Sequence, residues 1–103
     1  MNDHEYDSHE FEWEFRHLVI VIEVRLKPQS LGNDFDHLEI RSKHPERCPL
    51  PMTETGYRSH WAIHGEYASA EEAAKAVHAW LDEEAEKAEW LEFVTESEQP
   101  SLF

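Results

Sequence analysis

Apolar and charged residues alternate along the first part of the chain with the two-residue period of β-strands. Phe11, Trp13 and Phe15 alternate with charged residues, which is typical of a strand with one buried and one solvated face. The alternation continues over 18–26 in the opposite phase, so a bulge or tight turn is predicted near residues 16–17. Two valines on the other face favour a central position for this second strand.

Two further strands are predicted on either side of a proline-rich segment. Turn-forming residues at 27–34 close a loop, and a third strand follows in which Leu38 and Ile40 face inward. Three prolines within 43–56 remove backbone donors and indicate an ordered loop. A fourth strand over 57–66 then places its odd-numbered residues on one face and its even-numbered residues on the other.

An amphipathic helix is predicted over 69–93, with Ser69 as its N-cap and Glu72 completing a capping box. At about 100° per residue, apolar side chains share one arc and acids the opposite arc. The apolar side chains are Ala70, Ala73, Ala74, Val77, Trp80, Leu81, Ala85, Ala88 and Leu91. The acids are Glu71, Glu72, Asp82, Glu83, Glu86 and Glu89. The predicted fold class is α+β, an antiparallel sheet of about four strands packed by one long C-terminal amphipathic helix.

Length and composition indicate a single domain. The 103 residues are 40% hydrophobic and 12% aromatic, which supplies enough apolar area for one core. The acidic stretch 1–9 has no apolar period and is predicted to be a flexible arm. The single α+β domain is expected over 10–94, and a C-terminal tail over 95–103.

Charge is distributed unevenly along a chain whose net charge is -14. Residues 1–15 hold six acids and no Lys or Arg, and 66–103 hold eleven acids and two bases, whereas 41–65 hold four bases and two acids. So acidic a protein repels a phosphate backbone, which argues against direct binding of nucleic acid. The N-terminal residues have no basic segment before an apolar stretch, and no apolar run is long enough to span a bilayer, so a cytoplasmic protein without membrane contact is expected.

Neither a cofactor nor a metal site is predicted. Cys48 is the single cysteine, so an intramolecular disulfide and a cysteine-based zinc site are excluded, and a reducing compartment is favoured. His60 and His64 share one face of the fourth strand but lie ~13 Å apart at ~3.3 Å per residue. A zinc site would need a third ligand, such as His37 or His17, from a neighbouring strand.

The leading candidates for partner binding are five acids of the helix: Glu72, Asp82, Glu83, Glu86 and Glu89. Carboxylates three or four residues apart on a helix lie ~5–6 Å from one another, a spacing comparable with that of phosphates along a nucleic-acid strand. Such a row could imitate DNA or RNA and attract the basic groove of a nucleic-acid-handling protein. The alternative is a solvated helix face whose charge only keeps the protein soluble.

The alternative candidates for partner binding are Tyr57, Arg58 and His60, which follow the glycine turn at Gly56. Hydroxyl, guanidinium and imidazole groups are the components of an anion pocket. A serine nucleophile is disfavoured because Ser59 and His60 would point to opposite faces of the strand. In a purely structural interpretation, Gly56 supplies a positive φ, Tyr57 packs, and Arg58 pairs with a carboxylate.

The most specific motif of the chain is Pro-Leu-Pro at 49–51 with Thr-Glu-Thr-Gly-Tyr-Arg-Ser-His at 53–60, followed by Ala-Trp-Leu at 79–81. Over about residues 37–90 the chain resembles a family of short bacterial proteins found on plasmids and integrative elements of proteobacteria. The resemblance implies a genetic context rather than an activity. Small acidic proteins of such elements are often inhibitors of host defence, including anti-CRISPR and anti-restriction proteins, and some mimic nucleic acid, which is an argument by analogy.

These observations predict a non-enzymatic acidic protein that binds a basic surface of a nucleic-acid-handling complex of host defence, such as a CRISPR or restriction system, and inhibits it. Two alternatives stay open. One is an adaptor or antitoxin-like module whose partner contacts the 49–61 loop. The other is a small phosphate- or metal-dependent enzyme that uses Arg58, Ser59 and His60. A homodimer is compatible with either kind of binding protein.

Overall fold

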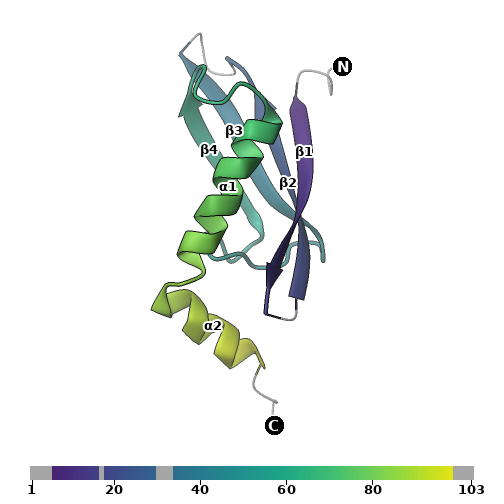
Figure 1. Ribbon diagram of the computed structural model, residues 1–103, viewed down its shortest axis with the longest axis vertical. Helices are drawn as coiled ribbons and strands as arrows, with labels where there is room; N and C mark the ends of the chain where they lie inside the picture. The colour runs from purple at the N-terminus through teal and green to yellow at the C-terminus, as the bar shows by residue number, and fades with distance from the viewer. Residues whose placement is uncertain (1–5, 17, 30–33, 99–103) are drawn as a thin grey trace.

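A four-stranded antiparallel sheet followed by two helices forms the fold (Figure 1). The computed structural model describes residues 6–16, 18–29 and 34–98. The strands are β1 (Asp7–Phe15), β2 (Leu18–Lys27), β3 (Phe35–His44) and β4 (Tyr57–Ile63), and they neighbour one another in chain order. The helices are α1 (Ala70–Glu84) and α2 (Ala88–Glu98). The predicted α+β class with four antiparallel strands is confirmed.

The connection between β1 and β2 is a tight turn, as the reversal of phase predicts. β1 and β2 pair from Asp7 opposite Leu26 to Phe15 opposite Leu18, and Arg16 turns the chain with a φ of 56°. The turn predicted near residues 16–17 is therefore confirmed, although His17 lies outside the described residues. Since β2 lies between β1 and β3, its predicted central position is confirmed as well. Residues 30–33 of the next predicted turn also lie outside the described residues.

One face of the sheet is buried under α1, which packs against β1 and β2. The buried apolar side chains of the strands are Trp13, Ile20, Ile22, Val24, Leu26, Leu38, Ile40 and Ala62. Those of α1 are Ala70, Ala73, Ala74, Val77 and Leu81. Leu38 and Ile40 face inward as predicted, and burial of this apolar area is the main stabilising term of the fold. The opposite face of the sheet, here called the open face, is not covered by the helices (Figure 1).

The prediction of a single helix over 69–93 is wrong, because α1 ends at Glu84 and α2 begins at Ala88. After α1 the chain makes a tighter turn of the 3₁₀ type, with hydrogen bonds between residues three apart. These run from Glu86 N–H to Glu83 O (3.3 Å) and from Lys87 N–H to Glu84 O (3.1 Å). A straight helix would continue beyond the end of the sheet with nothing under its apolar stripe. The break instead brings Trp90 of α2 to 5.8 Å from the Phe15 ring.

The start of α1 is capped as predicted and is also tied to the first strand. Ser69 Oγ accepts the Glu72 N–H at 3.2 Å, and Glu72 Oε1 accepts the Ala68 N–H at 3.2 Å. Asp7 Oδ2 accepts the Ala70 N–H at 2.8 Å, and the acid at the positive end of the helix is favourable.

The predicted domain limits need correction at both ends. Residues 7–9 belong to β1 rather than to a flexible arm, because their backbone pairs with β2. Residues 95–98 belong to α2 rather than to a tail. The rest of the predicted arm and tail, 1–5 and 99–103, lies outside the described residues. None of the described helices is long and apolar enough to span a membrane.

A buried carboxylate, Asp36, joins three segments at one end of the sheet. The residue is 2% exposed. Its carboxylate accepts hydrogen bonds from Gln29 N–H (2.7 Å) and Gly65 N–H (3.3 Å), and it contacts His64 Nδ1 at 2.8 Å. Burial alone would raise the pKa of Asp36, but these hydrogen bonds outweigh it and lower the pKa below its ordinary value of 3.8. The carboxylate therefore stays charged and holds the ends of β2 and β4 together.

Candidate functional site

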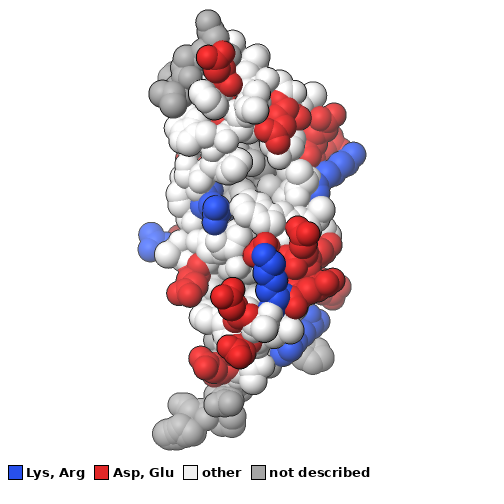
Figure 2. Space-filling view, turned by 90° about the vertical axis from the view of Figure 1, so that its left-hand side faces the viewer, with Lys and Arg blue, Asp and Glu red and all other residues white. Residues whose placement is uncertain are grey.

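The predicted row of helix acids is divided into two groups. Glu72 lies in the first turn of α1, where its carboxylate accepts the Ala68 N–H. Asp82 and Glu83 lie about 15 Å further along the axis at 1.5 Å per residue. Lys75 occupies an exposed position between them. Figure 2 shows acidic side chains in separate groups with uncharged surface between them. A continuous row along the whole helix is therefore not present in the described structure.

The other predicted acids gather around the break between the helices. Glu86 lies in the connection and Glu89 in the first turn of α2. Residues 82–96 hold seven acids and one lysine, Lys87, and this segment reaches beyond the end of the sheet (Figure 1). We call the seven acids the helix-junction acids: Asp82, Glu83, Glu84, Glu86, Glu89, Glu92 and Glu96.

Two of the helix-junction acids, Asp82 and Glu84, have side-chain contacts within the chain, although the side chain of Asp82 is itself 59% exposed. Asp82 Oδ1 accepts the indole N–H of Trp13 at 3.0 Å, and Oδ2 lies 3.2 Å from His78 Nδ1. Glu84 pairs with Lys87 at 2.8 Å, and that hydrogen bond raises the pKa of Lys87. Glu83, Glu86, Glu89, Glu92 and Glu96 are exposed. The structure thus favours these exposed acids over Asp82 as contacts for a partner.

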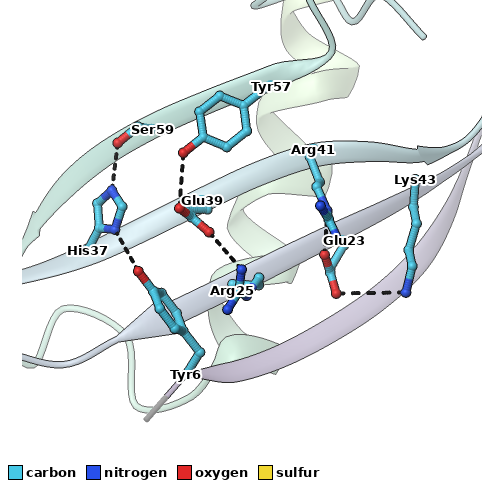
Figure 3. Close-up of polar contacts among 9 residues, drawn as sticks. All are labelled: Tyr6, Glu23, Arg25, His37, Glu39, Arg41, Lys43, Tyr57 and Ser59. Carbon is cyan, nitrogen blue, oxygen red and sulfur yellow. Dashed lines mark hydrogen bonds and ion pairs between the residues drawn. The ribbon is translucent and has the colours of Figure 1, made fainter. Parts of the chain in front are cut away.

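The open face carries a polar network that crosses the strands (Figure 3). In one chain of contacts, the Tyr6 hydroxyl lies 3.1 Å from His37 Nδ1, and His37 Nε2 lies 2.6 Å from Ser59 Oγ. In a second chain, Arg25 Nη1 donates to Glu39 at 3.2 Å and the Tyr57 hydroxyl donates to Glu39 at 3.0 Å. Partial burial and the Glu39 hydrogen bond raise the pKa of Tyr57.

A third group of contacts neutralises Glu23, which is only 8% exposed. Arg41 Nε donates to Glu23 at 2.6 Å, and Lys43 Nζ lies 3.9 Å from the same carboxylate (Figure 3). Lys43 also bonds to Glu10 of β1, and this hydrogen bond raises the pKa of Lys43. Because the cations pair with carboxylates of the same sheet, the network stabilises the strand pairing more than it offers charge to a ligand.

Ser59 and His37 have the composition of a nucleophile and a base, yet the second ring nitrogen of His37 faces a hydroxyl. In a serine hydrolase a carboxylate holds the imidazole at this position and stabilises its charged form. The centre of the Trp61 ring lies 4.6 Å from that of the His37 ring, and the two ring planes are inclined by 34°. The prediction that Ser59 and His60 point to opposite faces of the strand is confirmed. The imidazole that contacts Ser59 belongs instead to His37, because β3 lies beside β4. The sequence pattern had not indicated this pairing, which depends on the register between the two strands.

The structure does not bring the alternative site of Tyr57, Arg58 and His60 together. Tyr57 lies on the open face, whereas Arg58 and His60 point to the helix side of the sheet. There the Arg58 guanidinium lies 5.1 Å from the centre of the Trp80 ring and donates to Met52 O at 3.1 Å. The expected partner of Arg58, a carboxylate, is thus replaced by a backbone carbonyl and an aromatic face.

The loop before β4 is ordered by a close backbone approach. Gly56 has a φ of +76°, as predicted, and a Cβ there would lie 2.6 Å from the carbonyl carbon of Arg47. Beside it lies a cavity of about 560 Å³. Its lining residues are Arg41, Ser42, Lys43, Glu46, Arg47, Thr55, Gly56 and Tyr57. Arg41 and Lys43 already pair with carboxylates of the sheet, so of the cations that line the cavity, Arg47 is the one with the fewest contacts to acids among the described residues.

Large apolar side chains are exposed along β4 on the open face. Tyr57 is 45%, Trp61 46% and Ile63 68% exposed, and Phe35 of the neighbouring β3 is 40% exposed. The alternation had placed Trp61 and Ile63 on one face without deciding whether that face is covered. Exposed aromatic and aliphatic groups that lie side by side mark candidate interaction surfaces.

The described histidines and the cysteine do not form a metal or nucleophile site. His37 and His60 lie on opposite faces of the sheet, so His37 cannot be the third ligand beside His60. Across 6–16, 18–29 and 34–98, no group of three or more His, Cys, Asp or Glu residues could hold a metal ion. His17 lies outside the described residues. Cys48 is half-buried, and burial raises the pKa of its thiol, which lowers its reactivity.

Comparison with protein families identifies a match over most of the described chain. A family model described as the third domain of KlcB matches residues 6–90, which include all four strands and α1. Comparison with curated proteins and with solved structures gives no match.

Proposed function

The chain belongs to the KlcB third-domain family, and we propose that it is a non-enzymatic interaction protein that binds and inhibits a nucleic-acid-handling complex through the helix-junction acids. The observation that carries this proposal is the density of exposed carboxylates between residues 82 and 96, where seven acids accompany one lysine. A cluster of one sign of charge attracts a surface of the opposite sign over a distance and accelerates association.

The arrangement of these acids also supports mimicry of nucleic acid. Glu89, Glu92 and Glu96 follow one another at three- and four-residue intervals on α2, so their side chains lie ~5–6 Å apart. The segment projects past the sheet, which gives a groove-shaped basic surface access to it (Figure 1). The resemblance to proteins of plasmids and integrative elements supports a CRISPR or restriction complex of the host as the partner, with the protein acting in the cytoplasm.

Reversing the charge of Glu83 and Glu86 together, with Glu83→Lys and Glu86→Lys, is expected to weaken partner binding by about tenfold or more. Both side chains are exposed, so the fold should tolerate the change. The partner would first be isolated from the native host by pull-down and mass spectrometry. Affinities of the wild type and the variant would then be measured by calorimetry at low and high salt.

A matched control carries Glu12→Lys and Glu14→Lys on the exposed face of β1. It changes the net charge by the same amount at a different surface, so it separates local docking from the general effect of net charge. Binding that is equal in the two variants, or that does not weaken as salt is raised, would overturn the acidic docking surface.

A second candidate function is an adaptor or antitoxin-like module that contacts its partner through the 49–61 segment. The exposed Tyr57 and Trp61 side chains favour it, since aromatic residues often carry interface energy. In that case Tyr57→Ala should abolish binding, whereas the Glu83 and Glu86 reversal should have little effect. The same calorimetric measurement therefore distinguishes the two functions.

A further inference from the structure

The backbone of β4 is open along one side. β4 is an edge strand whose neighbour in the described sheet is β3. In an antiparallel pair, residues that bond to the neighbouring strand alternate with residues whose N–H and C=O groups point away from it. The bond from His64 N–H to Asp34 O (2.9 Å) fixes this phase, since it directs even-numbered residues of β4 toward β3. Ser59 and Trp61 therefore direct their backbone groups away from the sheet.

Among the described residues, contacts occupy the two ends of this edge and leave its middle open. The Tyr57 carbonyl accepts hydrogen bonds from Thr53 Oγ1 (2.9 Å) and Thr55 Oγ1 (3.2 Å). The Ile63 carbonyl accepts the Glu66 N–H at 2.9 Å. The residues between them, 59–61, thus form a short row of donors and acceptors that another strand could pair with.

The two edges of the sheet differ in the charge that they carry. On β1, Glu10, Glu12 and Glu14 follow one another on one face, and like charges that lie opposite one another oppose strand pairing. β4 is the one described strand that contains neither Asp nor Glu. Its cation, Arg58, is turned toward Trp80 and Met52 of the same chain.

We propose that β4 is a dimerisation edge, at which a second copy of this chain pairs antiparallel with β4 about a two-fold axis at His60. In this register Ser59 lies opposite Trp61 of the partner subunit, and Tyr57 lies opposite the partner's Ile63. Both open residues, Ser59 and Trp61, then exchange backbone hydrogen bonds with the other copy. The two four-stranded sheets become one continuous sheet.

This register agrees with the free backbone groups and the exposed side chains of β4. It leaves the occupied carbonyls of Tyr57 and Ile63 outside the central bonds. It also gives cross-strand neighbours to side chains that are 45% (Tyr57), 46% (Trp61) and 68% (Ile63) exposed in one copy. Two chains of net charge -14 repel one another, so they associate best at the strand without acids. The inference does not depend on the function proposed above.

Analytical ultracentrifugation of the full chain under reducing conditions tests the proposal. We expect a monomer–dimer equilibrium at micromolar to millimolar concentrations, with a dimer fraction that rises with salt because salt screens the repulsion between the copies. This salt dependence is opposite to that expected for docking on a basic partner. A chain that sediments as a monomer at every concentration and salt would overturn the dimer.

Charged substitutions at Ser59 and Trp61, which lie opposite one another in the proposed dimer, test the register. Ser59→Lys with Trp61→Lys places like charges opposite one another twice, and so does Ser59→Glu with Trp61→Glu. Each double variant should be monomeric, and an equimolar mixture of the two should recover a heterodimer. Both positions are exposed, and circular dichroism would verify the fold. A control with Glu12→Lys and Glu14→Lys should still dimerise.

A measurement on the unaltered chain covers the case in which a double variant fails to fold. Exchange of the Ser59 and Trp61 amide hydrogens should slow as the protein concentration rises, whereas exchange along the outer edge of β1 should not. Dimers that persist in both double variants, or exchange at Ser59 and Trp61 that is independent of concentration, would contradict pairing through β4.

Discussion

Trp13→Ala is expected to lower the free energy of unfolding by about 4 kcal/mol, because it leaves a large cavity in the core. Trp13 of β1 is 1% exposed and has its ring 5.6 Å from that of Phe15. Its indole N–H also donates to Asp82 at 3.0 Å, so one side chain both fills the core and fixes the end of α1. Urea unfolding followed by circular dichroism measures the loss.

Trp13→Phe provides the matched control for this prediction. It keeps most of the apolar volume but loses the hydrogen bond to Asp82, so it should cost about 1–2 kcal/mol. Equal losses in the two variants would contradict the packing role, since the hydrogen bond alone would then account for the effect. Because Asp82 precedes the exposed acids of the helix junction, Trp13→Ala should also weaken any binding that requires their orientation.

Asp36→Ala is expected to cost about 3 kcal/mol, since it leaves several groups without their charged acceptor. Gln29 N–H, Gly65 N–H and His64 all contact this carboxylate. The variant should unfold at a lower urea concentration than the wild type with a similar dependence on urea. An unchanged midpoint would contradict the role of Asp36 in joining the ends of β2 and β4.

The contribution of Asp36 should depend on pH in a defined direction. Its pKa is lower in the folded chain than its ordinary value of 3.8, so the folded state binds the proton less readily than the unfolded state does. The stabilisation is therefore complete above that value and is lost as the pH falls through the lower folded pKa. Measured against Asp36→Asn, the stability difference should be constant at neutral pH and shrink below about pH 4. A constant difference at all pH values would contradict this assignment.

The proposed acidic surface and the proposed dimer edge lie on different elements and respond differently to salt. The helix-junction acids lie on α1, α2 and the connection between them, whereas the dimer edge is β4 (Figure 1). Salt should weaken docking on a basic partner and strengthen dimerisation. A dimer would present two acidic segments at once, which would raise the apparent affinity for a partner that has two basic sites.

The amino-acid sequence by itself determined the strands, their phases and the start of the helix. Alternation placed Leu38 and Ile40 inward, and the reversal of phase located the turn at Arg16. Ser69 and Glu72 identified the first turn of α1. These features depend on neighbours within a few positions, so local pattern and capping chemistry suffice to predict them.

Only the tertiary structure decided where the helix ends and which surfaces are exposed. The apolar period continues past Glu84, but the sheet beneath it does not, and the chain turns so that Trp90 reaches Phe15. Alternation separates the two faces of β4 but does not determine which face the helix covers, so the exposure of Trp61 depends on where α1 packs. The pairing of Ser59 with His37 depends on the register between β3 and β4. Contacts between distant segments arise from how the elements pack, and the period of a single element contains no information about them.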